Sequence, residues 1–360
     1  MVPGLIVVPL IHWRKPHKNF MKTNMNKTNH PNIDTTIVVT GGLGFIGSRF
    51  IKHVYDNTDW NIINIDKQTY AADKSRIPEY INDSERYEWM KCDIADDLLK
   101  YDGVSEAAYL VNFAAESHVD NSIKDGKPFL ESNIMGVHAL LATGLGMWNL
   151  KKFVQISTDE VYGDMADLRG TQSASESFNL KPSSYYSSSK AAADLLVLSA
   201  ARTFNLPYLI TRSCNNFGPG QDPEKFLPKI FKCIEEGTTV PVYGDGEHLR
   251  EWIHVDENVA MIFNLLCDKD IINETVNIGT DQLMTNNAIL KTLGTVLGKP
   301  VKQKFVEDRL GHDRAYRLDC FKLHHYFTKW GWNEIFNPLG TTLEEYFTYE
   351  LERTKSTTDR

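Results

Sequence analysis

Two adjacent carboxyl groups, Asp159 and Glu160, follow Thr158 and are the residues of this chain that say most about its chemistry. The apolar run at residues 153–157 is typical of a buried parallel strand, so all three side chains are expected at the strand's carboxyl end. Repulsion between such close carboxyls favours one protonated acid beside one ionised base. Elimination of water needs both groups side by side. The structural alternative is that Asp159 caps the following turn while Glu160 is solvated.

Three glycines, Gly41, Gly44 and Gly47, lie between a predicted strand and a predicted helix. Glycine lets the backbone approach a pyrophosphate closely, and a helix N-terminus supplies free N–H groups. Asp66 ends the next predicted strand, 19 residues after Gly47. A carboxylate there hydrogen-bonds a ribose 2′-hydroxyl and repels a 2′-phosphate. The pattern therefore predicts NAD rather than NADP, although Asp66 as a helix cap would suit either cofactor.

Tyr186 and Lys190 are spaced i, i+4 on a predicted helix and therefore share one face. A neighbouring ammonium favours the phenolate, so we expect Lys190 and a positive nicotinamide ring to lower the pKa of Tyr186. Tyr186 would then be the base that removes a proton from a substrate alcohol. The adjacent Tyr185 has Ser189 four residues on and lacks this partner. The alternative is an aromatic side chain packed beside a solvated lysine.

The elements that must position these residues alternate between short apolar runs and helical segments, which predicts a Rossmann-type, doubly wound parallel sheet. Ligands of such sheets lie at the carboxyl ends of the strands. The predicted strands are residues 36–40, 61–65, 108–113, 153–157 and 208–212. The predicted helices include residues 45–55, 129–145 and 187–204.

Three regions are predicted along the chain. Residues 1–33 form a leader, expected to be disordered, whose basic residues follow its apolar ones, the reverse of a secretory signal. Residues 34–215 are expected to be the NAD-binding Rossmann domain. Glycine and proline become frequent in residues 216–360, which predicts a smaller and mainly substrate-binding lobe, part of which could return to the Rossmann sheet.

The composition narrows the class of protein. The chain has 360 residues, 42% hydrophobic and 24% charged, which is ordinary for a globular protein. A net charge of −8 argues against a nucleic-acid partner, and no apolar run is long enough to span a bilayer. The cysteines have no Cys-x-x-Cys spacing, which argues against a disulfide framework or a metal site and favours the reducing cytoplasm. They are Cys92, Cys214, Cys233, Cys267 and Cys320.

The run Ser-Thr-Asp-Glu-Val-Tyr-Gly at residues 157–163 resembles the signature of the nucleotide-sugar 4,6-dehydratases, a family of extended short-chain dehydrogenases/reductases. The similarity extends over residues 36–319. Sister 4-epimerases lack the Asp-Glu pair, and sugar-acid decarboxylases and GDP-mannose dehydratases tend to have Thr-Ser-Glu, so Asp159 separates these families. The further blocks that carry the resemblance are residues 66–70, 113–120, 215–219, 223–225, 243–246 and 311–314.

The resemblance implies a role for each catalytic residue. Tyr186 takes the proton of the sugar 4-hydroxyl while hydride passes from C4 to NAD, and Thr158 hydrogen-bonds the new C4 carbonyl. Glu160 removes the C5 proton, Asp159 protonates the departing C6 hydroxyl, and the hydride returns to C6. No metal is required. The substrate would be a dTDP- or UDP-hexose such as glucose, and a 4-keto-6-deoxy product would suit rhamnose synthesis.

The resemblance also implies binding residues, among which Arg250 and Arg309 match a diphosphate because guanidinium forks fit phosphate oxygens. Those expected on NAD are Gly41, Gly44, Phe45, Ile46, Gly47, Asp66, Lys67, Thr69, Asp93, Ile94, Ala114, Ala115, Ser117, Ser132, Tyr186, Lys190 and Asn216. Those expected on the nucleotide-sugar are Ser117, Thr158, Asn215, Lys225, Phe226, Pro241, Tyr243, Arg250, Asn286, Arg309 and His312.

Family members commonly dimerise through two helices per subunit, and residues 191–204 carry a suitable small and apolar stripe, so a homodimer is expected. The same stripe would serve the core of a monomer. Two other functions remain open. One is a sugar epimerase or decarboxylase on the same scaffold. The other is a non-catalytic nucleotide-binding protein, because a fold alone does not prove activity.

Overall fold

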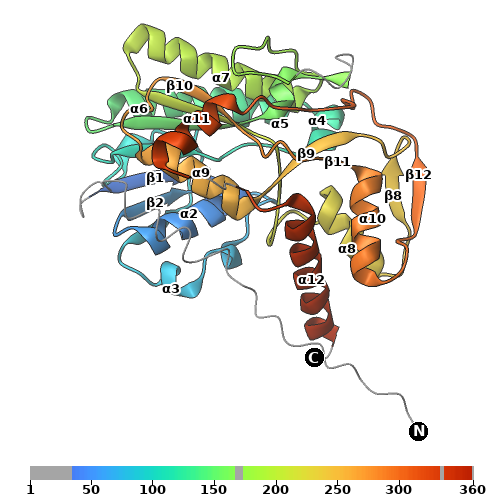
Figure 1. Cartoon of the computed structure of the whole chain (residues 1–360). Helices are drawn as coiled ribbons and strands as arrows, with labels where there is room; N and C mark the ends of the chain where they lie inside the picture. Colours follow the sequence, from blue (N-terminus) through green and yellow to red (C-terminus); the bar gives the residue numbers. More distant parts are fainter. Residues whose placement is uncertain (1–34, 167–172, 333–335, 359–360) are drawn as a thin grey trace.

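The computed structural model describes residues 35–166, 173–332 and 336–358. Within these residues, seven parallel strands form the central sheet in the order β10-β6-β5-β4-β1-β2-β3 (Figure 1). The predicted Rossmann-type sheet is therefore confirmed, and all five predicted strands belong to it. The strands are β1 (Thr36–Thr40), β2 (Asn61–Ile65), β3 (Tyr87–Met90), β4 (Tyr109–Asn112), β5 (Lys152–Thr158), β6 (Tyr208–Ser213) and β10 (Glu274–Ile278).

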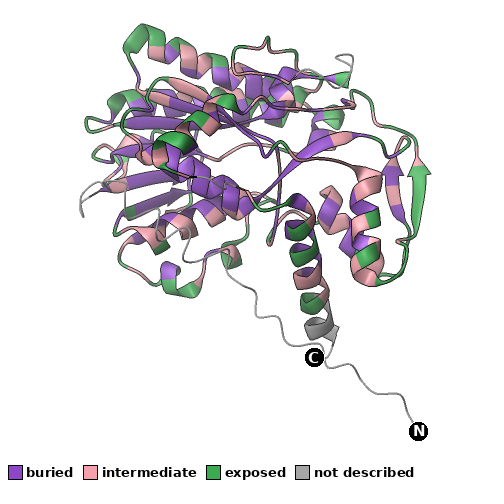
Figure 2. Cartoon of the chain, in the orientation of Figure 1, coloured by how far each residue is buried: buried purple, intermediate pink, exposed green. Residues whose placement is uncertain are grey.

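Strand β1 illustrates why these segments form a doubly covered sheet. Ile37 and Val39 pack into the core on one face, and Val38 packs into the core on the other, because successive side chains of a strand point to opposite sides. A parallel sheet covered on both faces needs such continuous apolar runs. In Figure 2 the strands are accordingly buried along most of their length.

Helices cover both faces of the sheet (Figure 1). On one face α2 (Phe45–Asn57) packs against α9 (Val255–Cys267), and α11 (Phe321–Trp330) contributes to the same core. On the other face α6 (Val137–Gly146) packs against α7 (Tyr185–Phe204). The short helical segments are η1 (Lys74–Arg76), α3 (Glu79–Asn82), η2 (Leu98–Lys100), α4 (Val119–Lys124) and η4 (Asp159–Tyr162).

The strand register aligns the carboxyl ends of the central strands. Thr40, the last residue of β1, lies opposite Ile65 of β2 and Asn112 of β4. Thr158 of β5 lies opposite Ser213 of β6. The direction in which strands are added reverses between β1 and β4, which is where doubly wound sheets bind ligands.

The single helix predicted for residues 129–145 is interrupted in the structure. It consists of α5 (Lys127–Leu130), a π-helical turn η3 (Glu131–Gly136) and α6. The π turn directs Asn133 at the loop after β4, where its Oδ1 accepts the N–H of Glu116 at 2.8 Å and its Nδ2 donates to the Glu116 carbonyl at 2.9 Å. Nδ2 also lies 2.8 Å from Oγ of Ser189 on α7. The interruption therefore ties a strand-end loop to the helix that carries Tyr186.

The second half of the chain forms a smaller lobe with its own core around Phe217, Trp252 and Tyr346, at the side of the main sheet (Figure 1). Its strands are β7 (Asn215–Phe217), β8 (Val240–Tyr243), β9 (Leu249–His254), β11 (Leu283–Thr285) and β12 (Gln303–Val306). Its helices are α8 (Phe226–Glu235), α10 (Asn286–Leu297) and α12 (Leu339–Thr358).

Part of the second half returns to the main sheet, as the sequence had left open. Strand β10 pairs with β6, and α9 and α11 pack on the sheet. Lys152, buried at the start of β5, donates from Nζ to the carbonyls of Leu265, Leu266 and Asp268 at 2.9, 2.9 and 3.0 Å. These carbonyls end α9 and have no intrahelical partner of their own. Residue 215 is therefore not a clean boundary between two independent units.

Three sequence expectations concern the surroundings of the protein. The sequence predicts no disulfide framework, and all five cysteines are free in the structure. In the part of the chain that the structure describes, no helix combines the length and apolar character that crossing a bilayer demands. The predicted disordered leader, residues 1–33, lies outside the described residues.

Candidate active site

A cleft of about 560 Å³ opens at the carboxyl ends of the central strands. Residues from the loops after β1, β4, β5 and β6 line one side, and residues of β8, β9 and the loop after β12 line the other. The five predicted catalytic residues come together on its lining. They are Thr158, Asp159, Glu160, Tyr186 and Lys190.

The turn η4 positions the two carboxyls. Thr158 ends β5 and caps this turn, because its Oγ1 accepts the N–H of Glu160 at 3.3 Å. Its hydroxyl also lies 3.1 Å from Oδ1 of Asp159. The alternative in which Asp159 caps the turn is therefore wrong, and Glu160 is half-buried on the cleft wall rather than fully solvated.

Helix α7 begins immediately before the predicted base. Ser184 is its N-cap, and the side chains of Ser184 and Ser187 form reciprocal hydrogen bonds with each other's backbone N–H groups. This capping box starts the helix at Tyr185, so that Tyr186 and Lys190 lie one turn apart and both reach the cleft. Tyr185 instead leaves 58% of its surface exposed and does not line the cleft.

Burial and nearby charges act differently on the pKa values of the two carboxyls, Asp159 and Glu160. Burial, and next the charge of Glu160, raises the pKa of Asp159 to about 8. Its Oδ2 has no hydrogen-bond partner among the described residues. Burial also raises the pKa of Glu160, but Arg309, Lys225 and Arg250 oppose that rise. At neutral pH Asp159 therefore retains a proton that it can donate, while the cations around Glu160 favour its ionised form.

Burial dominates the pKa of Tyr186, whereas the lowering expected from the sequence also includes the charge of a bound nicotinamide ring. Burial raises this pKa, the charge of Glu160 adds to the rise, and the hydroxyl of Thr158 opposes it. Lys190 directs its Nζ at the carbonyl of Ile156, at 2.5 Å, rather than at the phenol. Burial lowers the pKa of Lys190 to about 8, and the charge of Asp194 opposes that shift.

The glycine turn has the geometry that a dinucleotide pyrophosphate requires. Gly41 has a φ of +69°, and a Cβ there would lie 2.5 Å from the backbone N of Ala114, so only glycine fits. Gly44 is the N-cap of α2 and makes no side-chain cap, and Phe45 and Ile46 of the first turn line the cleft. The N-terminus of α2 is therefore open to an anion.

Asp66 holds this turn in place. Its Oδ2 accepts the N–H of Leu43 at 3.0 Å, and its Oδ1 accepts the N–H of Gln68 at 2.7 Å. Lys67 forms an ion pair with Asp93 at 3.2 Å. Contact of every predicted residue with NAD stays a prediction, and some of these residues do not line the cleft. Those residues are Asp66, Lys67, Thr69, Asp93, Ile94, Ala114 and Ser132.

All of the predicted nucleotide-sugar residues line the cleft. Arg250 donates from Nη2 to the carbonyl of Asp313 at 2.7 Å, and its guanidinium lies 4.4 Å from the ring centre of Tyr316. Beyond Thr158, the residues are Ser117, Asn215, Lys225, Phe226, Pro241, Tyr243, Arg250, Asn286, Arg309 and His312. Of the predicted NAD residues, Gly41, Gly44, Phe45, Ile46, Gly47, Ala115, Ser117, Tyr186, Lys190 and Asn216 also line it.

The cleft residues that sequence reasoning missed include Asp120, His248 and Tyr316. Asp120 accepts from Arg309 at 3.1 Å and lies 3.5 Å from the hydroxyl of Tyr243. It belongs to one of the blocks that carried the resemblance, but 189 positions separate it from Arg309. Only the folded chain brings such a pair together.

Comparison with known proteins agrees with this geometry. The profile of the NAD dependent epimerase/dehydratase family matches residues 37–279. The low-salt glycan biosynthesis protein Agl12 of Haloferax volcanii is 44% identical over 79% of this chain and 90% of its own length. The dTDP-glucose 4,6-dehydratase 1 of Escherichia coli is 36% identical over 80% of this chain and 86% of its own length. The crystal structure of the dTDP-glucose 4,6-dehydratase DesIV of Streptomyces venezuelae with NAD bound superimposes with a TM-score of 0.80 at 33% identity, covering 88% of this chain and 97% of that one.

Proposed function

Because the chain belongs to the NAD-dependent epimerase/dehydratase family and its cofactor is NAD, we propose that it is a nucleotide-sugar 4,6-dehydratase. The observation that carries the proposal is the pair Asp159 and Glu160, which line the cleft side by side. The pKa of Asp159 is raised to about 8, so this residue can serve as the acid while Glu160 serves as the base.

The proposed reaction assigns each proton to a residue of the cleft. Tyr186 removes the proton of the sugar 4-hydroxyl, and Thr158 hydrogen-bonds the carbonyl oxygen that forms at C4. That carbonyl makes the C5 proton acidic, so that Glu160 can remove it while Asp159 protonates the C6 hydroxyl, which leaves as water. Reprotonation at C5 completes the 4-keto-6-deoxy sugar. When bound, NAD supplies the reversible hydride transfer that links C4 and C6.

The proposed role of Tyr186 as a base depends on positive charge near its phenol. Burial raises the pKa of Tyr186, so proton removal by its phenolate requires added positive charge from the bound nicotinamide and from Lys190. Lys190, one turn along α7, is buried at the same wall. The open N-terminus of α2, with Gly41, Gly44 and Phe45, would hold the pyrophosphate of NAD.

The proposed substrate is a dTDP- or UDP-glucose. Lys225, Arg250 and Arg309 give the far wall of the cleft the cations that a diphosphate needs. We propose that residues 34–215 mainly hold NAD and that residues 216–360 supply most of the substrate contacts. A 4-keto-6-deoxy sugar would serve deoxysugar synthesis, such as that of rhamnose, or assembly of a glycan, the process that the name of the Agl12 relative states.

Two further proposals concern the oligomeric state and the cellular location of the protein. Helix α7 exposes 57% of Leu195 and 61% of Phe204, which supports the predicted homodimer through this helix. The five free cysteines are compatible with a cytoplasmic location.

A sugar epimerase is the second candidate function, because Tyr186, Lys190 and the glycine turn would serve it equally well. The buried acid Asp159 favours the dehydratase, since an epimerase does not need to protonate a leaving hydroxyl.

Mass spectrometry of the products from dTDP-glucose and from UDP-glucose tests the function. We expect one of the two to lose one water with no net consumption of NAD, and the ratio of the kcat/KM values identifies the preferred nucleotide. Tyr186→Phe should abolish the reaction, whereas the neighbouring and exposed Tyr185→Phe should leave it intact. An isobaric product, a loss of carbon dioxide or no reaction with either substrate would contradict the proposal.

A further inference from the structure

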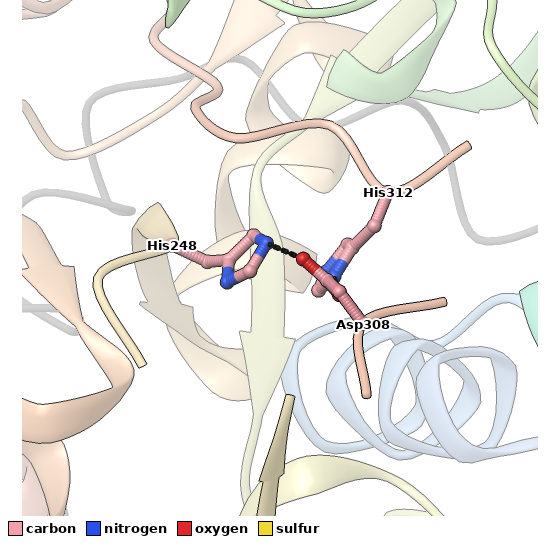
Figure 3. A group of neighbouring side chains, drawn as sticks. All are labelled: His248, Asp308 and His312. Carbon is pink, nitrogen blue, oxygen red and sulfur yellow. Dashed lines mark hydrogen bonds and ion pairs between the residues drawn. The ribbon is translucent and has the colours of Figure 1, made fainter. Parts of the chain in front are cut away.

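Three side chains, His248, Asp308 and His312, form a compact group (Figure 3), and the two histidines line the cleft. His248 immediately precedes β9, and Asp308 and His312 lie in the loop that follows β12. The two imidazole rings stack with centroids 3.8 Å apart and planes 16° apart. Asp308 spans both of them, with Oδ2 at 2.9 Å from Nε2 of His248 and Oδ1 at 2.6 Å from Nδ1 of His312.

His248 is unusual for a buried polar side chain. It is 1% exposed, and neither of its ring nitrogens has a hydrogen-bond partner among the described residues. Nε2 is close to the Asp308 carboxylate but does not meet it in hydrogen-bonding geometry. Buried polar groups are normally satisfied, so a buried imidazole that faces a carboxylate without a hydrogen bond indicates a missing partner. A metal cation could bind both Nε2 of His248 and the carboxylate of Asp308.

The surrounding charges permit a cation at this group. Arg314 is already paired with Asp245 at 2.6 and 2.7 Å, and Arg309 with Asp120 at 3.1 Å. Arg250 directs its guanidinium at backbone carbonyls and at the ring of Tyr316. Arg314 and Arg309 therefore each have a carboxylate partner outside the group, and neither pairs with Asp308.

We propose that His248, Asp308 and His312 form a binding site for a late first-row divalent transition metal such as Zn²⁺. The three ligand atoms lie within 4.8 Å of one another. Zn–N and Zn–O bonds of about 2.0–2.2 Å need the ligand atoms only slightly further apart than the present N–O distances. The exposed loop that carries Asp308 allows that adjustment, and the rings must turn out of their parallel stack because imidazole binds a metal in its ring plane.

The ligand set selects the kind of metal. Two imidazoles and one carboxylate suit Zn²⁺, Co²⁺, Ni²⁺ or Cu²⁺, whereas Mg²⁺ and Ca²⁺ prefer oxygen ligands alone. Three protein ligands leave a further position open, as in sites that also bind a small molecule. Both histidines line the cleft, so an ion held there would lie at the wall that carries Arg309. The proposal does not depend on which sugar reaction the enzyme performs.

Metal titration of the full-length protein, first dialysed against a chelator, tests the site. Zn²⁺ binding is measured by competition with a chromophoric chelator, and Co²⁺ binding by its visible absorption bands. We expect the wild type to bind one more ion per chain than His248→Gln, with micromolar or tighter affinity. Loss of a direct ligand should weaken binding at that site by about a hundredfold or more, since loss of an outer-shell partner already costs 10–100-fold.

Two further variants keep the test decisive. Asp308→Asn changes an exposed loop residue, so it should fold normally and lose the same ion. His118→Gln is the matched control, because His118 is half-buried on the other side of the cleft, has an unpartnered Nδ1 among the described residues and lies outside the group. It should bind as the wild type does. The proposal is overturned if the wild type binds no more Zn²⁺ and Co²⁺ than His248→Gln, or if His118→Gln loses the ion as well.

Discussion

Two buried aspartates near the end of β5 have opposite surroundings. Asp159 is 2% exposed and Asp194, on α7, is 0% exposed. Asp194 receives a hydrogen bond from Nε of Arg212 at 2.9 Å and another from Ser157 at 3.0 Å. Among the described residues, the side chain of Asp159 has one hydrogen-bond partner, the Thr158 hydroxyl at 3.1 Å. Burial raises the pKa of both carboxyls, but only at Asp194 does a directly bonded guanidinium oppose the rise.

Asp194 accepts two hydrogen bonds and Asp159 one, and each aspartate leaves one oxygen without a partner among the described residues, so the main difference is the bonded cation. Around Asp194 the pairing continues, since Arg212 donates to the hydroxyl of Tyr162 at 2.9 Å and Tyr162 donates to Asn277 of β10 at 2.7 Å. Tyr162 ends η4, the turn that carries Asp159. A paired charge network thus supports the turn, and the unpaired carboxyl on that turn remains available for chemistry.

The largest effect is expected when the unpaired acid, Asp159, is removed. Asp159→Asn keeps the shape of the side chain but cannot donate a proton. We expect kcat for dehydration to fall by about a thousandfold, or about 4 kcal/mol of transition-state stabilisation. The free energy of unfolding should not decrease, because a buried unpaired acid is replaced by a neutral amide. Steady-state kinetics and urea denaturation measure the two quantities, and a kcat close to that of the wild type would favour the epimerase.

The converse change removes the paired carboxylate. Asp194→Asn leaves the Arg212 guanidinium buried without its counter-ion, and we expect the free energy of unfolding to fall by about 3 kcal/mol. Urea denaturation at pH 7 measures the loss. The double variant Asp194→Asn/Arg212→Met is the control, and it should recover part of the stability because no charge remains unpaired. An unchanged denaturation midpoint for the single variant would show that the pair contributes nothing.

The raised pKa of Asp159 should also make kcat and the free energy of unfolding depend on pH. The pKa of Asp159 is raised to about 8, so the acid loses its proton as the pH passes that value, and kcat should fall by about tenfold per pH unit above it. For stability, the folded chain keeps a proton on Asp159 that the unfolded chain releases above the ordinary carboxyl pKa of 3.8. Asp159 therefore contributes stability fully below that value and loses the contribution as the pH rises toward 8. In Asp159→Asn this slope of stability against pH should be smaller than in the wild type.

The smallest expected effect concerns Ser157. Ser157→Ala removes one hydrogen bond to Asp194 but leaves Arg212 in place, so the free energy of unfolding should fall by about 1 kcal/mol. The same urea titration detects this change. A loss as large as that of Asp194→Asn would mean that the hydroxyl, and not the guanidinium, stabilises the carboxylate.

Local patterns were sufficient to predict the strands that carry the site. Strands β1 and β2 have the predicted bounds, because each is a continuous apolar run between polar segments. Strand β3 was missed because it is only four residues long and includes the exposed Glu88. Strand β10 was missed because about sixty residues separate it from its partner β6. The π turn η3 was missed because it depends on the tertiary contact of Asn133 with Glu116.

In the site, too, local patterns predicted some features, while others depend on tertiary contacts. Asp159 and Glu160 are adjacent in sequence and Tyr186 and Lys190 are one helical turn apart, so spacing alone predicted each pair. The contacts of Arg309 with Asp120 and of His248 with Asp308 join segments that are distant along the chain, and no local pattern predicts them. The lowered pKa of Tyr186 stays a prediction because it includes the charge of the nicotinamide ring, whereas burial, which spacing does not measure, raises the pKa of this phenol.

The position of β10 at the edge of the main sheet has a consequence for synthesis of the protein in the cell. The ribosome completes β6 about sixty residues before it reaches β10, so the nascent chain presents β6 as an unpaired sheet edge during that interval. The surface of α2 that packs against α9 is uncovered until α9 has emerged. Exposed edges and apolar faces are the surfaces through which incomplete chains aggregate. The first half of the chain should therefore mature only after β10 has been translated, and a fragment that ends at residue 215 should need chaperone protection.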